Sequence, residues 1–205
     1  MGKSLIIIGA GGHGRVTADA AVQMGLWDRV FFADDRPDLS NTAGHEVIGT
    51  VEQAFAYIDR SDYIVAVGSG RIRRNIQVSL ESRGAGLATI IHPSAIIGSE
   101  VLLGRGTVVM AGAVIQCSTA IGKGCIINTR AAIDHDNTIG DYVHISPGVC
   151  LAGNVSVGDH TWMGIGSAVI HNITIAANCM VGAGSAVIRD LTEAGTYVGV
   201  PVRRL

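Results

Sequence analysis

The most polar segment in the second half of the chain places a histidine beside two carboxylates. It contains Asp134, His135, Asp136 and Asn137, and it interrupts a long run of aliphatic and small residues. A carboxylate beside an imidazole fixes the tautomer and raises the basicity of the ring, which suits a histidine for accepting a proton from a reacting group. A solvated surface pair is the alternative interpretation. Given its setting, we predict that His135 is a general base and that Asp136 is its partner.

A glycine loop near the N-terminus has the spacing of a nucleotide-binding turn. Gly9, Gly11 and Gly14 form the pattern G-x-G-x-x-G between an aliphatic run and a helical segment, and the acidic pair Asp34-Asp35 follows about 20 residues later. In this setting, backbone N–H groups face a diphosphate and a carboxylate reaches a ribose. The alternative is a tight turn that binds nothing.

The elements around this loop alternate between strands and helices. Strands are expected at 5–8, 30–33, 63–67 and 88–91, and helices after the glycine loop, over 51–58 and from residue 71. Such alternation predicts a small Rossmann-like α/β domain with a parallel sheet over residues 1–88. A complete dinucleotide fold needs about 150 residues. The loop therefore indicates a nucleotide or a nucleotide-sugar rather than NAD.

The second half follows a six-residue repeat. Every sixth residue from Ile97 to Val187 is aliphatic, at all sixteen positions. The residue two places earlier is small or β-branched in every case except Asn137. This hexapeptide pattern predicts a parallel β-helix over residues 89–190, with three hexads per coil, followed by a C-terminal tail over 191–205. Stacked aliphatic side chains fill such a prism, so function must lie on its outside.

Residues 18 positions apart stack in columns on this prism. His135 lies between Cys117 below and Gly153 above, and the glycine leaves space beside the imidazole. His144 is nine residues further on, which places it on a different side of the prism. A single chain therefore cannot bring His144 to His135, whereas two prisms packed side by side can.

Metal and thiol chemistry are not expected. Successive histidines from His135 to His171 are separated by 9, 16 and 11 residues, which does not supply the close pair of a β-helical zinc site, and His160 is expected to be exposed. Cys125 and Cys179 occupy inward positions, and no base adjoins the outward cysteines in the sequence.

Composition excludes several other classes. A net charge of −2 and a pI near 6.4 provide no basic surface for nucleic acid or anionic lipid. No apolar run approaches the roughly 18 residues that cross a bilayer. Four scattered cysteines fit a reducing compartment, so a soluble cytoplasmic protein is expected.

The motifs together resemble a known family. The glycine loop, the uninterrupted hexads, Asn128-Thr129 before the His-Asp pair and the ending 198–201 are similar to the bacterial hexapeptide-repeat sugar acetyltransferases of the PglD/NeuD type. The resemblance covers essentially the whole chain. It implies a left-handed β-helix that assembles as a homotrimer with active sites between subunits. Acetyl-CoA is then a co-substrate in the grooves between prisms, with no metal and no tightly bound cofactor.

The resemblance also implies roles for individual residues. His135 is the base, Asp136 tunes it, and His144 contacts the acetyl group from the adjacent subunit. Other acetyl-CoA contacts fall at Gly153, Ile165 and Ala183. The nucleotide-sugar pocket is formed by Gly11, Gly12, His13, Asp34, Asp35 and Gly68.

The expected function is acetyl-CoA-dependent N-acetylation of a nucleotide-activated 4-amino-sugar, in glycan precursor synthesis. Asp136, where an O-acetylating branch of the family can carry glycine, favours an amine acceptor. O-acetylation of sialic acid or of another sugar hydroxyl is the second hypothesis. A non-catalytic trimeric scaffold that binds a nucleotide-sugar is the third. The sugar, and the choice between UDP and GDP, stay open at this stage.

Overall fold

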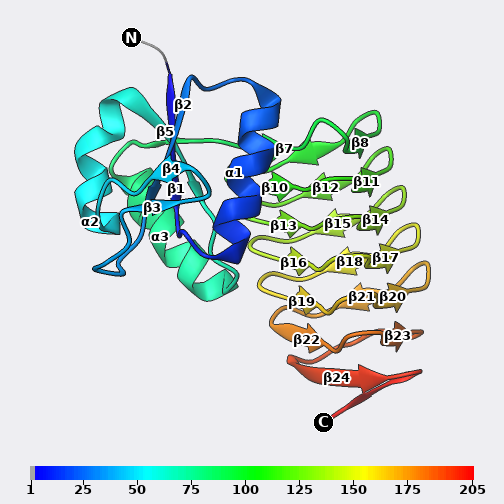
Figure 1. Cartoon of the computed structure of the whole chain (residues 1–205). Coiled ribbons are helices and arrows are strands. Elements are labelled where there is room, and N and C mark those ends of the chain that lie inside the picture. Colours follow the sequence, from blue (N-terminus) through cyan, green and yellow to red (C-terminus); the bar gives the residue numbers. More distant parts are fainter. Residues whose placement is uncertain (1–2) are drawn as a thin grey trace.

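The computed structural model describes residues 3–205 and divides them into an α/β domain and a left-handed β-helix (Figure 1). Four parallel strands form the sheet of the first domain, in the order β2-β1-β5-β6. They are β1 (Ser4–Ile8), β2 (Arg29–Ala33), β5 (Ser61–Val65) and β6 (Gly86–Leu87). The other elements are the helices α1 (Gly12–Met24), α2 (Val51–Ala54) and α3 (Gly70–Ser82), a 3-10 helix (Phe55–Arg60) and the hairpin β3 (Asn41–Thr42) and β4 (His45–Glu46).

The central strand β1 is buried on both faces because helices cover both. Leu5 and Ile7 pack with alanines of α1, whereas Ile6 and Ile8 pack with Leu80 of α3 on the opposite face. A strand covered on both sides reads as a continuous aliphatic run, as this one does. The Rossmann-like fold expected for the first part of the chain is confirmed.

The β-helix has three faces, each a sheet of short strands stacked along the prism axis. The first face contains β7 (Ile90–Ile91), β10 (Val108–Val109), β13 (Ile126–Ile127), β16 (His144–Ile145), β19 (Trp162–Met163), β22 (Cys179–Val181), β24 (Gly195–Gly199) and β25 (Val202–Arg204). The second contains β8 (Ile96–Ile97), β11 (Val114–Ile115), β14 (Ala132–Ile133), β17 (Cys150–Leu151), β20 (Ala168–Val169) and β23 (Ala186–Val187). The third contains β9 (Leu102–Leu103), β12 (Ala120–Ile121), β15 (Thr138–Ile139), β18 (Ser156–Val157) and β21 (Thr174–Ile175).

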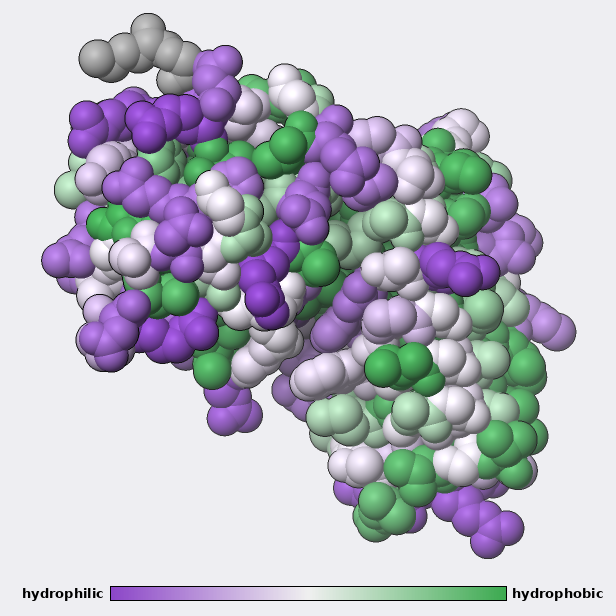
Figure 2. Space-filling model, in the orientation of Figure 1, coloured by the Kyte–Doolittle hydropathy of each residue, from purple (hydrophilic) through white to green (hydrophobic). Residues whose placement is uncertain are grey.

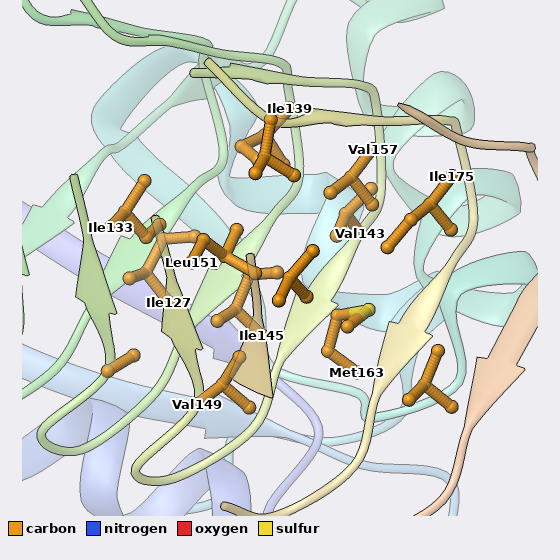
Figure 3. Close-up of a cluster of buried hydrophobic side chains, with 14 of the residues drawn as sticks. Ile127, Ile133, Ile139, Val143, Ile145, Val149, Leu151, Val157, Met163 and Ile175 are labelled. Atoms are coloured by element: carbon orange, nitrogen blue, oxygen red, sulfur yellow. The ribbon is translucent and has the colours of Figure 1, made fainter. Parts of the chain in front are cut away.

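Each coil pairs in parallel with the next at a shift of 18 residues, as the hexads predict. His144 pairs with Ile126 below it and with Trp162 above it. The second residue of each two-residue hexad strand points inward, as does Val181 of β22, so the hexad aliphatics form a continuous core (Figure 3). Cys125 and Cys179 are buried in this core, as expected.

Backbone crowding explains the glycines along one edge of the prism. A Cβ at Gly122 or Gly140 would lie 2.4 Å and 2.3 Å from a carboxylate oxygen of Asp141 and Asp159, respectively. Those carboxylates accept hydrogen bonds from the backbone N–H groups of Lys123 and Asp141 in the coil below. Glycine leaves room for this ladder.

Two segments differ from the sequence expectation. The single strand expected over 88–91 is divided between two sheets, because Ala88 N–H donates to Tyr63 in the α/β domain whereas Ile90 N–H donates to Thr107 in the prism. The C-terminal segment, expected as a tail, extends the first face through β24 and β25. Tyr197 and Val202 of these strands are buried in the prism core.

The α/β domain is docked on the first face of the prism. The outward residues Ile90, Val108 and Ile126 are buried there with Ala18 and Ala21 of α1. The docked domain leaves the coils nearer the C-terminus uncovered (Figure 1). Within residues 3–205, no helix has the length and apolar character required to cross a membrane.

Candidate active site

The predicted base lies on the turn between β14 and β15, at the edge where the second and third faces meet. His135 Nδ1 is 2.7 Å from Asp136 Oδ2, and Asp136 has a left-handed φ of 59°. A ring nitrogen that faces a carboxylate at this distance carries the proton, which leaves Nε2 as an acceptor. The hydrogen bond that His135 Nδ1 donates to Asp136, and then the negative charge of Asp134, raise the pKa of His135.

The imidazole needs the glycine in the coil above it. A Cβ at Gly153 would lie 2.5 Å from His135 Cε1 and 2.7 Å from Nε2, so any larger residue would displace the imidazole from this position. The ring therefore occupies the space that the column pattern predicted beside Gly153. His135 and Asp136 are both exposed in the single chain, so a proton acceptor is presented outward from the prism.

A second group of polar residues lies on the first face, where the α/β domain meets the prism. His144 stacks against Trp162 with 4.9 Å between ring centroids, and the amide of Asn128 contacts His144 Nε2 at 3.2 Å. His13, at the start of α1, and Arg73, in α3, are close enough to His144 for their charges to lower its pKa. The fold thus brings together two histidines that are 131 positions apart in the sequence.

The pKa values of these two histidines are shifted in the opposite direction from that of His135. Burial, and then the charge of Arg73, lower the pKa of His13 to about 4. Burial, and then the charges of His13 and Arg73, lower the pKa of His144 to about 3. Both rings are therefore neutral near pH 7. Of the three histidines, only His135 has a raised pKa, whereas burial opposes protonation of His13 and His144.

The depressed pKa values predict a loss of stability in mild acid. Below the ordinary histidine pKa of 6.5, the unfolded chain binds protons that the folded chain excludes down to about pH 4 at His13 and about pH 3 at His144. The free energy of unfolding should fall over this range by about 1.4 kcal/mol per pH unit for each histidine. Urea unfolding between pH 7 and pH 4 measures this decline.

The variant His144→Asn should flatten the decline, since one of the two groups is removed. His171→Asn is the matched control, because His171 is exposed on a turn of the same prism. An unchanged pH dependence in His144→Asn would contradict the assignment of the buried neutral ring.

Arg73 joins the two domains without an acidic partner. Its side chain is fully buried, and it donates to the carbonyl groups of Val67 and Gly68 at 2.7 and 2.9 Å and to those of Gly124 and Tyr142 at 2.6 and 2.8 Å. Within residues 3–205 it forms no salt bridge. Burial lowers its pKa to about 10. The guanidinium holds the loop after β5 against two turns of the prism.

The glycine loop divides into packed and open positions. Gly9 has a φ of 101°, and a Cβ at Gly14 would lie 1.9 Å from Gly9 O, so the close approach of helix to strand requires both glycines. Gly11 and Gly12 face open space, and α1 begins there without a side-chain cap. Uncapped N–H groups at the start of a helix attract an anion. The diphosphate loop expected from the sequence stays a prediction.

The acidic pair after β2 is already engaged within the protein. Asp34 accepts from Ala10 N–H at 2.8 Å and pairs with Arg36, and these contacts lower the pKa of Asp34 to about 2. Asp35 accepts from Val51 N–H at 3.0 Å, at the start of α2. The carboxylates expected to reach a ribose therefore brace the glycine loop and a neighbouring helix in this structure.

A hollow of about 730 Å³ opens between the start of α3 and the uncovered coils of the first face. Arg71, Arg74 and Asn75 line it from the α/β domain, and His160, Trp162 and Met180 line it from the prism. His160 was expected to be exposed, but its ring is half-buried and stacks on Tyr142 at 5.4 Å. The docked domain covers it, which a prism considered alone does not reveal.

The predicted site residues fall into separate regions of one chain. Gly11, Gly12, His13 and Gly68 lie at the carboxyl ends of β1 and β5, where open α/β sheets bind ligands, and Asp34 and Asp35 follow β2 at the same end. Gly153 shares the edge with His135. Ile165 and Ala183 instead follow β19 and β22, at the edge between the first and second faces.

Sequence reasoning missed several residues of the interface between the domains. Arg73 was recognised only as part of the helix expected from residue 71, and Trp162 was not singled out. The 18-residue register carried a signal for Trp162, since it places this residue directly above His144. No periodic signal marks Arg73.

Comparison with known proteins identifies the family. Residues 4–80 match the family model of the PglD N-terminal domain. The acetyltransferase domain of PglB from Neisseria gonorrhoeae FA1090, in complex with acetyl coenzyme A, is 37% identical, with a TM-score of 0.96 and 98% of each chain covered. This chain belongs to the PglD/NeuD-type sugar acetyltransferases.

Other solved structures share this fold. PerB from Caulobacter crescentus, in complex with CoA and GDP-perosamine, is 35% identical with a TM-score of 0.91, and the match covers 98% of this chain and 97% of PerB. WeeI from Acinetobacter baumannii AYE is 24% identical with a TM-score of 0.92, which shows the shared fold. The chain is an acyltransferase of the sugar N-acetyltransferase class, which sets aside the non-catalytic scaffold.

Proposed function

We propose that the protein transfers the acetyl group of acetyl-CoA to the amino group of a nucleotide-linked 4-amino-sugar, with UDP or GDP as the nucleotide. The observation that carries this proposal is the His135–Asp136 pair, held at 2.7 Å under Gly153 and directed away from the prism. The acetyl-CoA bound to the PglB domain and the CoA and GDP-perosamine bound to PerB support the two substrate classes.

The proposed reaction is a direct transfer. The sugar amine attacks the thioester carbonyl carbon, a C–N bond forms, and His135 Nε2 accepts the proton that the nitrogen loses. The C–S bond then breaks, and the CoA thiolate leaves and takes up a proton from the imidazolium. Asp136 keeps the Nδ1 proton in place and stabilises the charged ring. Such a base contributes about 10²- to 10⁴-fold to the rate.

The acceptor site is assigned to the α/β domain. The open backbone at Gly11 and Gly12 and the uncapped start of α1 suit the diphosphate, with His13 and Gly68 beside them. Asp34 and Asp35 hold the loop around the nucleotide. The hollow beside α3 gives the sugar a route toward the prism, and the neutral His144 lies on the same face.

The donor site requires a second prism. Gly153 lies on one edge and Ile165 and Ala183 on another, so one acetyl-CoA contacts all three residues only in a groove between two copies. An apolar hollow of about 390 Å³ on the second face, lined by residues including Val114, Ala132 and Ala168, suits such packing. Figure 2 shows apolar residues gathered on the prism, in contrast to the more hydrophilic α/β domain.

The groove leads us to propose a homotrimer. His135 of one copy then faces His144 of its neighbour, which a single chain keeps on different sides of the prism. Sedimentation at micromolar concentration should give the mass of three chains. A fully active monomer would contradict the shared site.

The proposed function is tested with a panel of acceptors. Purified protein is mixed with acetyl-CoA and UDP- or GDP-linked 4-amino-sugars, sialic acid and sugars without an amine, and release of the CoA thiol is followed. Turnover with one nucleotide-linked amino-sugar and acetylation of its nitrogen are expected. Turnover with sialic acid alone would establish O-acetylation instead.

A variant of the glycine loop tests the acceptor site in the same assay. Gly12→Asp adds a carboxylate where the diphosphate is proposed to lie, and its Cβ meets no neighbour within 4 Å. The KM for the nucleotide-sugar should rise about tenfold or more, the equivalent of roughly 1.4 kcal/mol, while the KM for acetyl-CoA stays unchanged. Ser82→Asp adds the same charge at the far end of α3 and should leave both values unaltered. Equal effects of the two variants would remove the loop from the site.

A further inference from the structure

The one exception to the small-residue rule of the hexads lies directly beside the proposed base. Asn137 occupies the inward position at which the other hexads carry a small or β-branched residue, and its side chain is 1% exposed. A buried amide in an aliphatic prism is costly unless all of its polar atoms are hydrogen-bonded. The partners of the amide therefore indicate what it does.

Threonines at the equivalent positions show what the prism itself needs there. Thr107 donates to the carbonyl of Gly122, 15 residues ahead, and accepts from the N–H of Cys125, 18 residues ahead. Thr161 forms the same two bonds in a later coil. A hydroxyl is thus sufficient to tie one coil to the next.

Asn137 forms both of these bonds and has a second N–H left for its own turn. Its Nδ2 donates to the carbonyl of Ala152 at 3.1 Å and its Oδ1 accepts from Val155 N–H at 3.2 Å, which reproduces the threonine pattern. The same Nδ2 also contacts the carbonyls of Asp134 at 2.6 Å and His135 at 3.2 Å, within its own turn. A threonine has no second donor for these carbonyls.

The additional contacts reach the peptide groups on both sides of His135. They add to two bonds already present there, from Thr119 Oγ1 to the carbonyl of Asp134 at 3.0 Å and from Asn154 N–H to the carbonyl of His135 at 3.0 Å. The carbonyl of His135 belongs to the peptide that joins it to Asp136, so holding that carbonyl restricts the φ of Asp136 and the direction of both side chains. The 2.7 Å contact between Nδ1 and the carboxylate depends on these directions. We propose that Asn137 is a positioning residue for the acetyl transfer, which holds the His135–Asp136 pair from inside the prism. This inference rests on the proposed role of His135 as base.

The test is Asn137→Thr, which keeps the type of bond between coils that Thr107, Thr119 and Thr161 form and loses the contacts of the second N–H with the turn. We expect kcat to fall about tenfold with an unchanged KM for acetyl-CoA, since small misplacements of a catalytic group are costly. The acidic limb of the rate profile should move to lower pH, because a weakened contact with Asp136 lowers the pKa of His135. When Asn137→Thr is added to a protein that already carries Asp136→Asn, the additional loss of kcat should be smaller than the loss that Asn137→Thr causes alone.

Thr107→Val is the matched control, because it removes the bonds between coils at another position of the same prism. It should lower the melting temperature and leave kcat and the pH profile unchanged. A normal kcat and pH profile in Asn137→Thr, or an equal loss of kcat in Thr107→Val, would overturn the positioning role. Normal turnover of His135→Ala would instead contradict the role of His135 as base. The two hypotheses, the base and its positioning by Asn137, are therefore tested by different variants.

Discussion

Replacement of His135 by alanine should lower kcat by about 10²-fold or more, the usual contribution of a positioned base. The melting temperature should hardly change, since exposed side chains away from the core alter stability by about 0.5 kcal/mol or less. Asp136→Asn should cost less, because the imidazole remains. Without the carboxylate the pKa of His135 falls, so the acidic limb of kcat/KM should move to lower pH. Profiles of kcat/KM against pH for the three proteins measure both effects.

The control is His171→Ala, two coils above His135 in the same column. It removes an exposed imidazole from the same edge of the prism and should leave turnover unchanged. Near-normal turnover of His135→Ala, together with loss of activity on substitution of His171 or Cys117, would show that another member of the column is the base.

Replacement of Arg73 by alanine should have the largest effect on stability. Four backbone carbonyls lose a charged donor, and a cavity remains between the domains. Release of a buried, unpaired cation offsets part of the loss, so the expected destabilisation is about 3 to 5 kcal/mol. Arg73→Lys should restore little, because three donors on one nitrogen cannot reach four separated carbonyls. Urea unfolding measures the free energy.

Arg71→Ala is the control for stability, since Arg71 is exposed two residues earlier in the same helix. It should leave the free energy of unfolding nearly unchanged. Equal stability of Arg73→Ala and the parent protein would mean that the docking of the two domains does not depend on the guanidinium.

The repeat itself specified the prism. In a β-helix each residue contacts the coil above and the coil below, so the period of the aliphatic residues fixes the register between coils and the inward direction of each hexad position. The stacking of His135 under Gly153 and the separation of His135 from His144 follow from this register alone. The turn at the glycine loop could also be predicted from the sequence, because Gly9 and Gly14 are required by local backbone geometry.

The contacts between the domains depended on the tertiary structure. Arg73 binds Tyr142 across 69 positions, and His13 lies close enough to His144 to alter its pKa, but nothing periodic links these residues in the sequence. The contacts of the Asp34 and Asp35 carboxylates also depended on the tertiary structure. Asp34 has the spacing of a ribose ligand, but the folded loop uses it to hold Ala10 and Arg36.

Asn137 was predictable from the sequence only in part. Its departure from the hexad rule was visible in the sequence, whereas the carbonyls that it binds were not. The hexad pattern fixes where a side chain stands on the prism, because coil stacking repeats every 18 residues. The partners of a buried polar atom are decided by how the turns close in three dimensions, and only the folded chain shows that Asn137 reaches back to His135.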